Sequence, residues 1–238
     1  MLVDFHSHIL PRIDDGSSSV EESLAMLRSS REQGINQIVL TPHFYPQHSS
    51  PDRFLEKRFR AIRRLAEAVD PSESLPAVRL GAEVYFYPHM SHSDDLRKLR
   101  IEGTDFVLVE MPMTEWTDRM YGELEGIHRN LGLTPIVAHV DRYLGRIRDY
   151  GIPERLADLP VLVQANASFF LRPGTKAMQM LRRKQIHVLG SDCHNMRDRA
   201  PNLGSAARQI VSKLGPEAIC WIQSNELEIF GTSGDVKA

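Results

Sequence analysis

Six short apolar segments, spread over almost the whole chain, are each followed by a histidine, a glutamate or an aspartate. Imidazole nitrogens and carboxylate oxygens are the ligands that borderline to hard divalent cations prefer. Burying so many of these groups together without a cation would cost several kcal/mol in desolvation and like-charge repulsion. We therefore interpret the set as a metal site. Its members are His6, His8, His43, Glu83, Glu110, His139, Asp192 and His194.

Each of these residues taken alone has a simpler interpretation. A single histidine at a strand end is more often a hydrogen-bonded core or rim residue than a ligand, and a single glutamate there is usually a helix cap or a solvated charge. Only their repetition favours a metal site. The set exceeds the four ligands of one tetrahedral ion, so we expect two or three divalent ions (Mn, Fe or Zn) bridged by carboxylates. Such clusters convert water to hydroxide near neutral pH, which is hydrolytic chemistry.

Two arginines closely follow predicted ligands. Arg142 lies three residues after His139, and Arg199 lies five residues after His194. A guanidinium group keeps its charge at any working pH and binds phosphate oxygens through two parallel hydrogen bonds. Each arginine has an alternative as a solvated rim charge or as the ion-pair partner of the aspartate that directly precedes it. Their shared position behind the ligands favours a phosphate ester as the substrate.

Parallel strands and helices must position these groups. The apolar segments are short, nearly continuous and rich in Val, Ile and Leu, which is typical of parallel strands covered on both faces. Helical patterns lie between them, and the first is bounded by a cap signal at Ser19 and a stop signal at Gly34. The alternation predicts an α/β fold, and seven strands favour a closed barrel whose C-terminal strand ends converge on one face. The expected strands are 2–5, 37–40, 77–80, 106–109, 135–138, 161–163 and 187–189, and the expected helices are 19–34, 53–69, 122–131, 175–184 and 202–214.

Length and composition agree with one such barrel. The chain has 238 residues, of which 42% are hydrophobic and 25% charged, and its net charge of −2 argues against nucleic-acid binding by overall charge. No apolar run approaches the roughly 18 residues of a membrane span, and the N-terminal segment lacks the apolar core of a signal peptide. Cys193 and Cys220 cannot form a disulfide framework. We expect a cytoplasmic protein without membrane insertion or a nucleic-acid partner.

The motifs that contain the predicted ligands also carry a family resemblance. They are His6-Ser-His8, Thr41-Pro-His43, Glu83, Glu110, His139-Val-Asp-Arg142 and Ser191-Asp-Cys-His194. Their order over nearly the whole chain resembles the PHP (polymerase and histidinol phosphatase) superfamily. Within it, the chain is most similar to bacterial protein-tyrosine phosphatases of the capsular polysaccharide type, the CpsB/YwqE family, on segments such as Asp14-Asp-Gly16, Gly81-Ala-Glu83 and Ser191–Asn195. One departure is Val140-Asp141, where many members have Pro-Glu.

This resemblance implies a distorted (β/α)7 barrel of the PHP, TIM-barrel-like type, as one metallophosphatase domain over residues 1–232 with a frayed tail at 233–238. It assigns the eight residues above as ligands of a trinuclear, usually manganese, site, and Arg142 and Arg199 as phosphate-binding residues. It implies a phosphoric monoester hydrolase that acts on phosphotyrosine through metal-activated hydroxide. The implied substrate is the C-terminal tail of a bacterial tyrosine autokinase that controls exopolysaccharide and capsule synthesis.

Several alternatives stay open. The same ligands suit a PHP phosphatase or phosphodiesterase for a small ester such as histidinol phosphate, or a regulatory binding domain, and assembly as a homo-oligomer is undecided. The spacing of Cys193 and Arg199 matches cysteine-dependent phosphatases. We reject that mechanism, because it needs a lowered thiol pKa and a loop of backbone N–H groups around the phosphate, and this segment contains no glycine.

Three further features have two interpretations each. Asp14 and Asp15 either act on a proton or a metal-bound water, or form a turn before the next glycine. The Phe44-Tyr45 loop either stacks on a substrate tyrosine or packs the barrel rim. The basic stretch from Arg53 to Arg64 is either a solvated helix face or a docking surface for an acidic, tyrosine-rich tail or another subunit.

Overall fold

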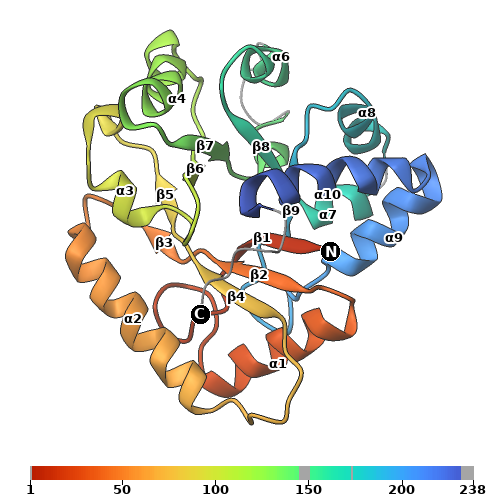
Figure 1. The fold of residues 1–238 in the computed structure, drawn as a ribbon. Helices are drawn as coiled ribbons and strands as arrows, with labels where there is room; N and C mark the ends of the chain where they lie inside the picture. The colour runs from red at the N-terminus through yellow and green to blue at the C-terminus, as the bar shows by residue number, and fades with distance from the viewer. Residues whose placement is uncertain (1, 145–150, 173, 232–238) are drawn as a thin grey trace.

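Parallel strands at the centre of the molecule form two sheets, and helices surround them (Figure 1). The computed structural model describes residues 2–144, 151–172 and 174–231. The smaller sheet has the strand order β1-β2-β4, and the larger sheet has the order β3-β5-β6-β7-β8-β9, with every pair parallel. The strands are β1 (Val3–Ser7), β2 (Gln37–Leu40), β3 (His43–Phe44), β4 (Ala77–Leu80), β5 (Glu83–Tyr85), β6 (Phe106–Glu110), β7 (Thr134–Val137), β8 (Leu162–Asn166) and β9 (Val188–Gly190).

Backbone hydrogen bonds between β1 and the segment after β9 join the two sheets on one side. The His8 N–H donates to the Cys193 carbonyl at 2.9 Å, and the Asp192 N–H donates to the His6 carbonyl at 2.8 Å. On the other side the chain itself connects the sheets, because β2 leads into β3 and β4 leads into β5. The strands therefore form the ring of the predicted α/β barrel.

Two of the seven predicted strands, 37–40 and 77–80, are each followed after two residues by a further short strand that belongs to the larger sheet. The interruptions are Thr41-Pro42 and Gly81-Ala82. Proline has no N–H for a strand ladder, and a Cβ at the glycine would lie only 3.2 Å from a side-chain atom of β2. The expectation of seven strands is therefore wrong as a count, since the described residues form nine, although the ring still has seven positions. A predicted ligand follows each interruption directly, His43 in β3 and Glu83 in β5.

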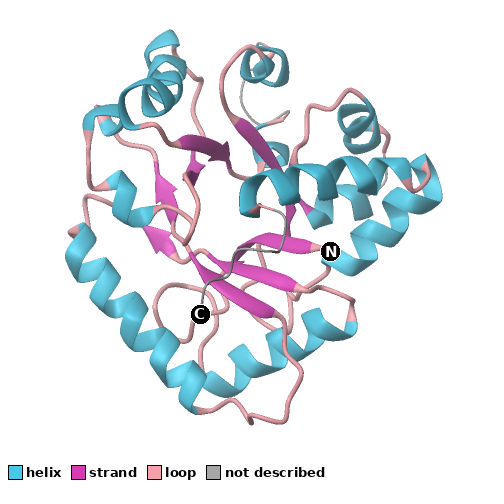
Figure 2. Ribbon diagram, in the orientation of Figure 1, coloured by secondary structure: helices cyan, strands magenta, loops and turns pink. Residues whose placement is uncertain are grey.

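Helices cover the outside of the barrel (Figure 2). All five predicted helices are present, and the largest error is the start of α4, four residues earlier than expected. None of the helices in the described ranges has both the length and the apolar character needed to cross a membrane. The helices are α1 (Val20–Glu32), α2 (Pro51–Glu67), the 3-10 helix η1 (Met90–His92), α3 (Leu96–Leu99), α4 (Asp118–Leu131), α5 (Val140–Tyr143), α6 (Ile152–Ala157), α7 (Ala167–Leu171), α8 (Lys176–Arg182), α9 (Leu203–Leu214) and α10 (Glu217–Phe230).

Side-chain caps determine where the first two helices begin. The Ser19 hydroxyl accepts the N–H of Glu22 at 3.2 Å, as the predicted cap of α1 requires. The capping box is incomplete. The Glu22 carboxylate accepts the N–H of Ser18 at 2.8 Å, whereas a full capping box requires the N–H of the cap residue Ser19. The helix α2 begins two residues earlier than expected, because Ser50 caps it and Pro51 suits the first helical position.

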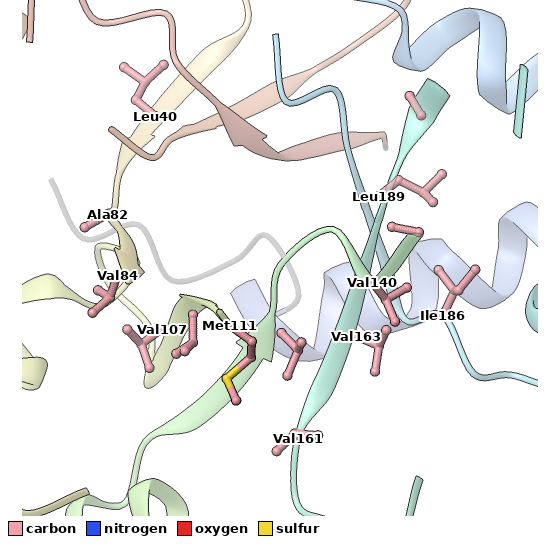
Figure 3. Close-up of a cluster of buried hydrophobic side chains, with 14 of the residues drawn as sticks. Leu40, Ala82, Val84, Val107, Met111, Val140, Val161, Val163, Ile186 and Leu189 are labelled. Atoms are coloured by element: carbon pink, nitrogen blue, oxygen red, sulfur yellow. The ribbon is translucent and has the colours of Figure 1, made fainter. Parts of the chain in front are cut away.

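Buried side chains lie on both faces of the strands. In β6, Val107 and Val109 belong to a large cluster that also contains buried helix residues, whereas Leu108 belongs to a second cluster with Val3 and Phe5. Alternate residues of a strand point to opposite faces, so the two clusters lie on opposite sides of the barrel wall. This double burial explains the nearly continuous apolar strand sequences. Figure 3 shows part of the larger cluster, with Leu40, Ala82, Val84, Val107, Met111, Val140, Val161, Val163, Ile186 and Leu189 labelled.

The long helix α10 was not predicted. Pro216 ends the pattern of α9 but also starts a new helix, since proline is tolerated at a helix N-terminus. The helix supports β1 in two ways. The rings of Phe230 and Phe5 stack with centroids 5.4 Å apart, and the Val3 N–H donates to Glu226 Oε1 at 3.1 Å. α10 therefore helps to hold the strand that contains the first predicted ligand.

The buried carboxylate of Glu226 predicts a pH-dependent stability. Burial raises its pKa from 4.5 to about 7, because one hydrogen bond from Val3 does not replace the lost hydration. The folded protein thus favours the protonated form, so its stability advantage is present below the unfolded pKa and is lost as the pH rises through about 7. Glu226→Gln keeps an acceptor for Val3 without the charge. We expect this change to increase the free energy of unfolding by about 2 kcal/mol more at pH 8 than at pH 5.

Urea unfolding at the two pH values measures this difference. Glu228→Gln is the matched control, because Glu228 is exposed on the same helix, and it should change stability little at either pH. An effect of Glu226→Gln that is the same at both pH values would contradict the assignment.

Candidate metal centre

The predicted ligands lie at or just beyond the C-terminal ends of β1, β2, β4, β6, β7 and β9. Active sites of α/β barrels are found on this face. Asn166, which ends β8, lies on the same face. His6 lies in β1 and His8 directly after it, His43 and Glu83 begin β3 and β5, Glu110 ends β6, His139 follows β7, and Asp192 and His194 follow β9. The structure brings all eight together.

The Glu83 carboxylate lies at the middle of the cluster and is 1% exposed. Its Oε2 atom is 2.8 Å from His43 Nδ1, 3.2 Å from His6 Nε2 and 3.3 Å from His8 Nε2. Its Oε1 atom is 2.9 Å from His139 Nε2. Four imidazoles thus face one buried carboxylate.

The other three predicted ligands border this arrangement. Glu110 Oε1 is 3.4 Å from His139 Nε2. Asp192 Oδ1 is 3.6 Å from His8 Nε2 and 3.7 Å from His194 Nδ1. The His194 ring lies over the His8 ring, with centroids 4.0 Å apart. No predicted ligand is separated from the rest.

The loop after β1 adds two aspartates whose roles the sequence left open. Asp14 Oδ2 accepts from His8 Nδ1 at 2.8 Å and from the backbone N–H of His43 at 3.0 Å, so it orients the His8 imidazole and holds the backbone of His43. Asp15 Oδ1 is 3.4 Å from His43 Nε2 and 3.5 Å from His194 Nε2, and its side chain is 67% exposed. Asp15 is therefore an additional candidate ligand that our predicted set omitted. The sequence analysis left its role open, because an Asp-Asp-Gly segment is also typical of a turn.

Neighbouring charges decide which imidazoles carry protons. Burial alone would lower the pKa of His8, but contacts with Asp14 and Glu83 raise it to about 10. Burial likewise opposes the charged form of His139, and its carboxylate neighbours raise its pKa to about 9. Burial and the charge on His8 lower the pKa of His194 to about 4. The carboxylates thus favour positive charge at the centre, which a divalent cation supplies by displacing these protons.

The donor atoms fit divalent metal ions. Among the described residues, buried His43 Nδ1, Glu83 Oε2, Glu110 Oε2 and His194 Nε2 make no hydrogen bond of acceptable geometry, although the first two atoms are only 2.8 Å apart. Three groups of donor atoms each lie within 4.8 Å of one another. They are His8, Asp15, His43 and His194; His6, His8 and Glu83; and His43, Glu83 and Glu110. Because the groups share members, they form one connected cluster rather than three separate sites.

Both predicted arginines contact the same carboxylate. Arg142 donates to Asp192 Oδ2, and Arg199 donates to Asp192 Oδ1 at 2.6 Å. Although burial opposes the ionised form, the positive charges of His6 and Arg142 lower the pKa of Asp192. A pocket of about 280 Å³ lies beside these groups, and its charged lining residues are Arg142, Arg172, Arg199, Asp141, Asp192 and Asp198, with Asn166 among the polar ones. An anion that enters this pocket meets two guanidinium groups at the edge of the cluster.

Two predicted ligands have strained backbones. His139 has φ 31° and Asp192 has φ 53°, in the left-handed region that costs a non-glycine residue about 1–3 kcal/mol. Gln164 holds the backbone of His139 in place, because its Oε1 accepts the His139 N–H at 2.6 Å. The same Oε1 atom lies 3.2 Å from His6 Nδ1. The sequence analysis missed Gln164. The available signal was a polar residue within an otherwise apolar strand, where it is completely buried.

The environment of Cys193 opposes a thiolate mechanism. The side chain is completely buried, and burial followed by the charge of Asp4 raises the pKa of the thiol. A nucleophilic cysteine requires a lowered pKa and access to the substrate. The geometry therefore agrees with our rejection of the cysteine mechanism.

Comparisons with known proteins give relatives along the whole chain. Tyrosine-protein phosphatase CpsB of Streptococcus pneumoniae is 30% identical over 231 residues, which cover 90% of this chain and 91% of the relative. The protein of the same name from Streptococcus agalactiae is 29% identical over 229 residues, which cover 91% and 92%. A crystal structure from work on Bacillus subtilis YwqE and S. pneumoniae CpsB, described as unique metal-dependent tyrosine phosphatases, matches with a TM-score of 0.77 and 22% identity, over 96% of this chain and 94% of the other. This last match shows a shared fold.

A parallel α/β barrel that gathers imidazoles and carboxylates at its C-terminal strand ends defines a barrel protein with a candidate metal centre. Within that class, the chain belongs to the family described as capsular polysaccharide synthesis, CpsB/CapC, whose model matches residues 2–229. The family resemblance inferred from the motifs is therefore confirmed.

The contact between Asp14 and His8 predicts an effect on metal affinity. A carboxylate that accepts from Nδ1 fixes the tautomer of an imidazole, and the loss of such a partner typically weakens metal binding 10- to 100-fold. We expect Asp14→Asn to weaken Mn²⁺ binding by about that factor, as measured by calorimetric titration of chelator-stripped protein. Asp94→Asn, at a side chain that is 91% exposed, is the control. Equal affinity in the Asp14 variant and the unaltered protein would contradict the orienting role.

Proposed function

We propose that this chain is a metal-dependent protein-tyrosine phosphatase. The observation that carries the proposal is the buried Glu83 carboxylate among four imidazoles, beside a pocket lined by Arg142 and Arg199. A metal-ligand cluster next to two guanidinium groups suits hydrolysis of a phosphate monoester. The names of the streptococcal relatives, both tyrosine-protein phosphatases, support phosphotyrosine as the ester.

The centre would hold two or three divalent ions, with manganese as the first choice and iron or zinc as alternatives. Nitrogen and oxygen ligands without a thiolate suit these ions. When bound, the ions would lower the pKa of water and offset the charge of the phosphate. The proposed ligands are His6, His8, His43, Glu83, Glu110, His139, Asp192 and His194, with Asp15 as an addition to this set.

The chain's own side chains would bind and orient the ester. Arg142 and Arg199 hold opposite oxygens of Asp192, so both guanidinium groups point to one place from two sides. A phosphate there would take their remaining N–H donors in the two-pronged geometry that arginine favours. The Asn166 amide donates to Asp192 Oδ2 at 2.9 Å and would keep that carboxylate in place when the arginines turn to the substrate.

The aromatic loop after His43 combines both interpretations drawn from the sequence. Phe44 is 2% exposed and packs on Phe54 with ring centroids 5.2 Å apart, so it belongs to the barrel rim. Tyr45 stacks on the His43 ring, with centroids 5.1 Å apart and an interplanar angle of 30°. We therefore assign Tyr45, not Phe44, as the contact for the aromatic ring of the substrate.

The physiological substrate would be the C-terminal tail of a bacterial tyrosine autokinase that controls exopolysaccharide and capsule synthesis. The family description, which concerns capsular polysaccharide synthesis, supports this choice. Such a tail is reached in the cytoplasm, where we place the protein. Residues 1–232 would act as one metallophosphatase domain, while the tail predicted at 233–238 lies outside the described residues.

Metal removal tests the proposal directly. Chelator-stripped protein should not hydrolyse a phosphotyrosine peptide, and addition of Mn²⁺ should restore turnover, because the arginines alone provide no nucleophile. Histidinol phosphate and a phosphodiester are assayed in parallel. Activity that survives stripping, with no tightly held metal left, would overturn the metal mechanism. Faster turnover of histidinol phosphate than of the peptide would replace the proposed substrate.

Single substitutions separate the metal mechanism from a cysteine mechanism. His139→Ala or Asp192→Ala should abolish peptide turnover, because each removes a proposed ligand. Cys193→Ser should keep most of the turnover, because the buried thiol takes no part. Steady-state kinetics and metal analysis of the three variants check this. Loss of activity in Cys193→Ser with its metals still bound would contradict the proposal.

A further inference from the structure

A basic groove lies next to the candidate metal centre. It has a volume of about 460 Å³ and combines one loop after β1 with the outer side of α2. Its lining residues are Arg12, Ile13, Lys57, Arg60, Arg63 and Arg64. No acidic side chain lines it within the described ranges, so the groove presents five cationic side chains around one apolar residue.

The basic groove continues into the metal centre. A second hollow of about 280 Å³ is lined by Asp15, His43 and Tyr45 and shares both Ile13 and Lys57 with the groove. A polypeptide with one side chain at the metal centre could therefore extend over Ile13 and Lys57 and enter the groove. This continuity distinguishes the groove from an ordinary solvated helix face.

Part of the positive charge in the groove is available to a ligand. Lys57 and Arg64 are exposed and make no ion pair with any described residue. Arg60 and Arg63 pair with Glu56 and Glu67, but these are exposed pairs one helical turn apart, which contribute little and are easily exchanged.

Arg12, which precedes Ile13 in the loop after β1, adds a cation whose position is fixed by backbone hydrogen bonds. Its backbone has φ 58°, and its N–H donates to the Ser17 carbonyl at 2.8 Å. Its Nε donates to the Ser18 carbonyl at 2.8 Å, which leaves the other guanidinium N–H groups for a ligand. The left-handed backbone conformation and these two hydrogen bonds orient Arg12 before any substrate binds.

We propose that the basic groove binds acidic side chains of the substrate polypeptide, close in sequence to the phosphotyrosine. The inference rests on the proposed function and names the substrate feature that the same site selects. Carboxylates complement a groove with five cations, and arginine forks bind them in pairs. The concave shape and the connection to the metal centre favour a polypeptide over a flat anionic membrane. The groove therefore sets substrate preference, while the centre performs the chemistry.

Two phosphotyrosine peptides test this inference. They share one sequence, except that the positions flanking the phosphotyrosine are Glu in one and Gln in the other. We expect the acidic peptide to have an about tenfold lower KM at low salt with a similar kcat, because the groove acts on binding. The ratio should approach one near 1 M salt, where charges are screened within about 3 Å. Fluorescence anisotropy with metal-free protein measures the same preference without turnover.

Substitutions assign the preference to the groove. Arg60→Gln with Arg64→Gln, both exposed on α2, removes two of the five cations and should clearly reduce the KM ratio. Arg208→Gln with Lys213→Gln is the matched control, because it removes two exposed cations from α9, across the molecule in Figure 1, and should keep the ratio. A KM ratio that is unchanged in the α2 variant would overturn the proposal.

Other outcomes are equally distinct. Hydrolysis of both peptides with equal KM and equal binding would overturn the groove inference and leave the proposed function intact. Preferential binding of the acidic peptide without any hydrolysis would support the groove and overturn the proposed function. If the protein prefers a neutral peptide with a second phosphotyrosine and shows no preference for the acidic peptide, the groove binds phosphate groups rather than carboxylates, which would overturn the proposal. Binding to anionic phosphatidylserine vesicles without a peptide preference would identify the groove as a membrane contact.

Discussion

The charge balance around one buried carboxylate is the constraint on which the rest of the structure depends. Glu83 is removed from water and faces four imidazoles from three separate segments of the chain. A carboxylate in that position is tolerated only with positive charge around it, and protonated imidazoles or divalent ions can provide that charge. The attraction between Glu83 and the imidazoles raises the pKa values of His8 and His139. The same attraction lowers the pKa of Glu83.

The barrel makes this concentration of charge feasible. Parallel strands bring all their C-terminal ends to one face, so residues far apart in sequence become neighbours without long loops. The two-residue breaks after β2 and β4 place a ligand directly at the start of β3 and β5. Apolar clusters on both faces of the strands and the packing of α10 on β1 provide the stability that offsets strained backbones at His139 and Asp192.

Much of this arrangement could be predicted from the sequence, because it follows from local patterns. Apolar segments marked the strands, and the polar residue after each one marked the candidate site. Relations between distant side chains could not be predicted in this way. Nothing local shows that Asp14 orients His8, that Gln164 supports His139, or that two arginines share Asp192. The helix α10 could not be predicted from Pro216, because a proline after one helix is compatible both with a loop and with the start of a new helix.

The most direct test of the account is anomalous diffraction at the manganese edge from crystals of Mn²⁺-loaded protein. The account predicts two or three peaks within coordination distance of the imidazoles and carboxylates around Glu83, at least one of them bound to Glu83 itself. It also predicts that Arg142 and Arg199 face the same peaks without coordinating them. A structure with no peak near Glu83, or with peaks held only by surface carboxylates, would contradict the central claim that this cluster exists to hold metal ions.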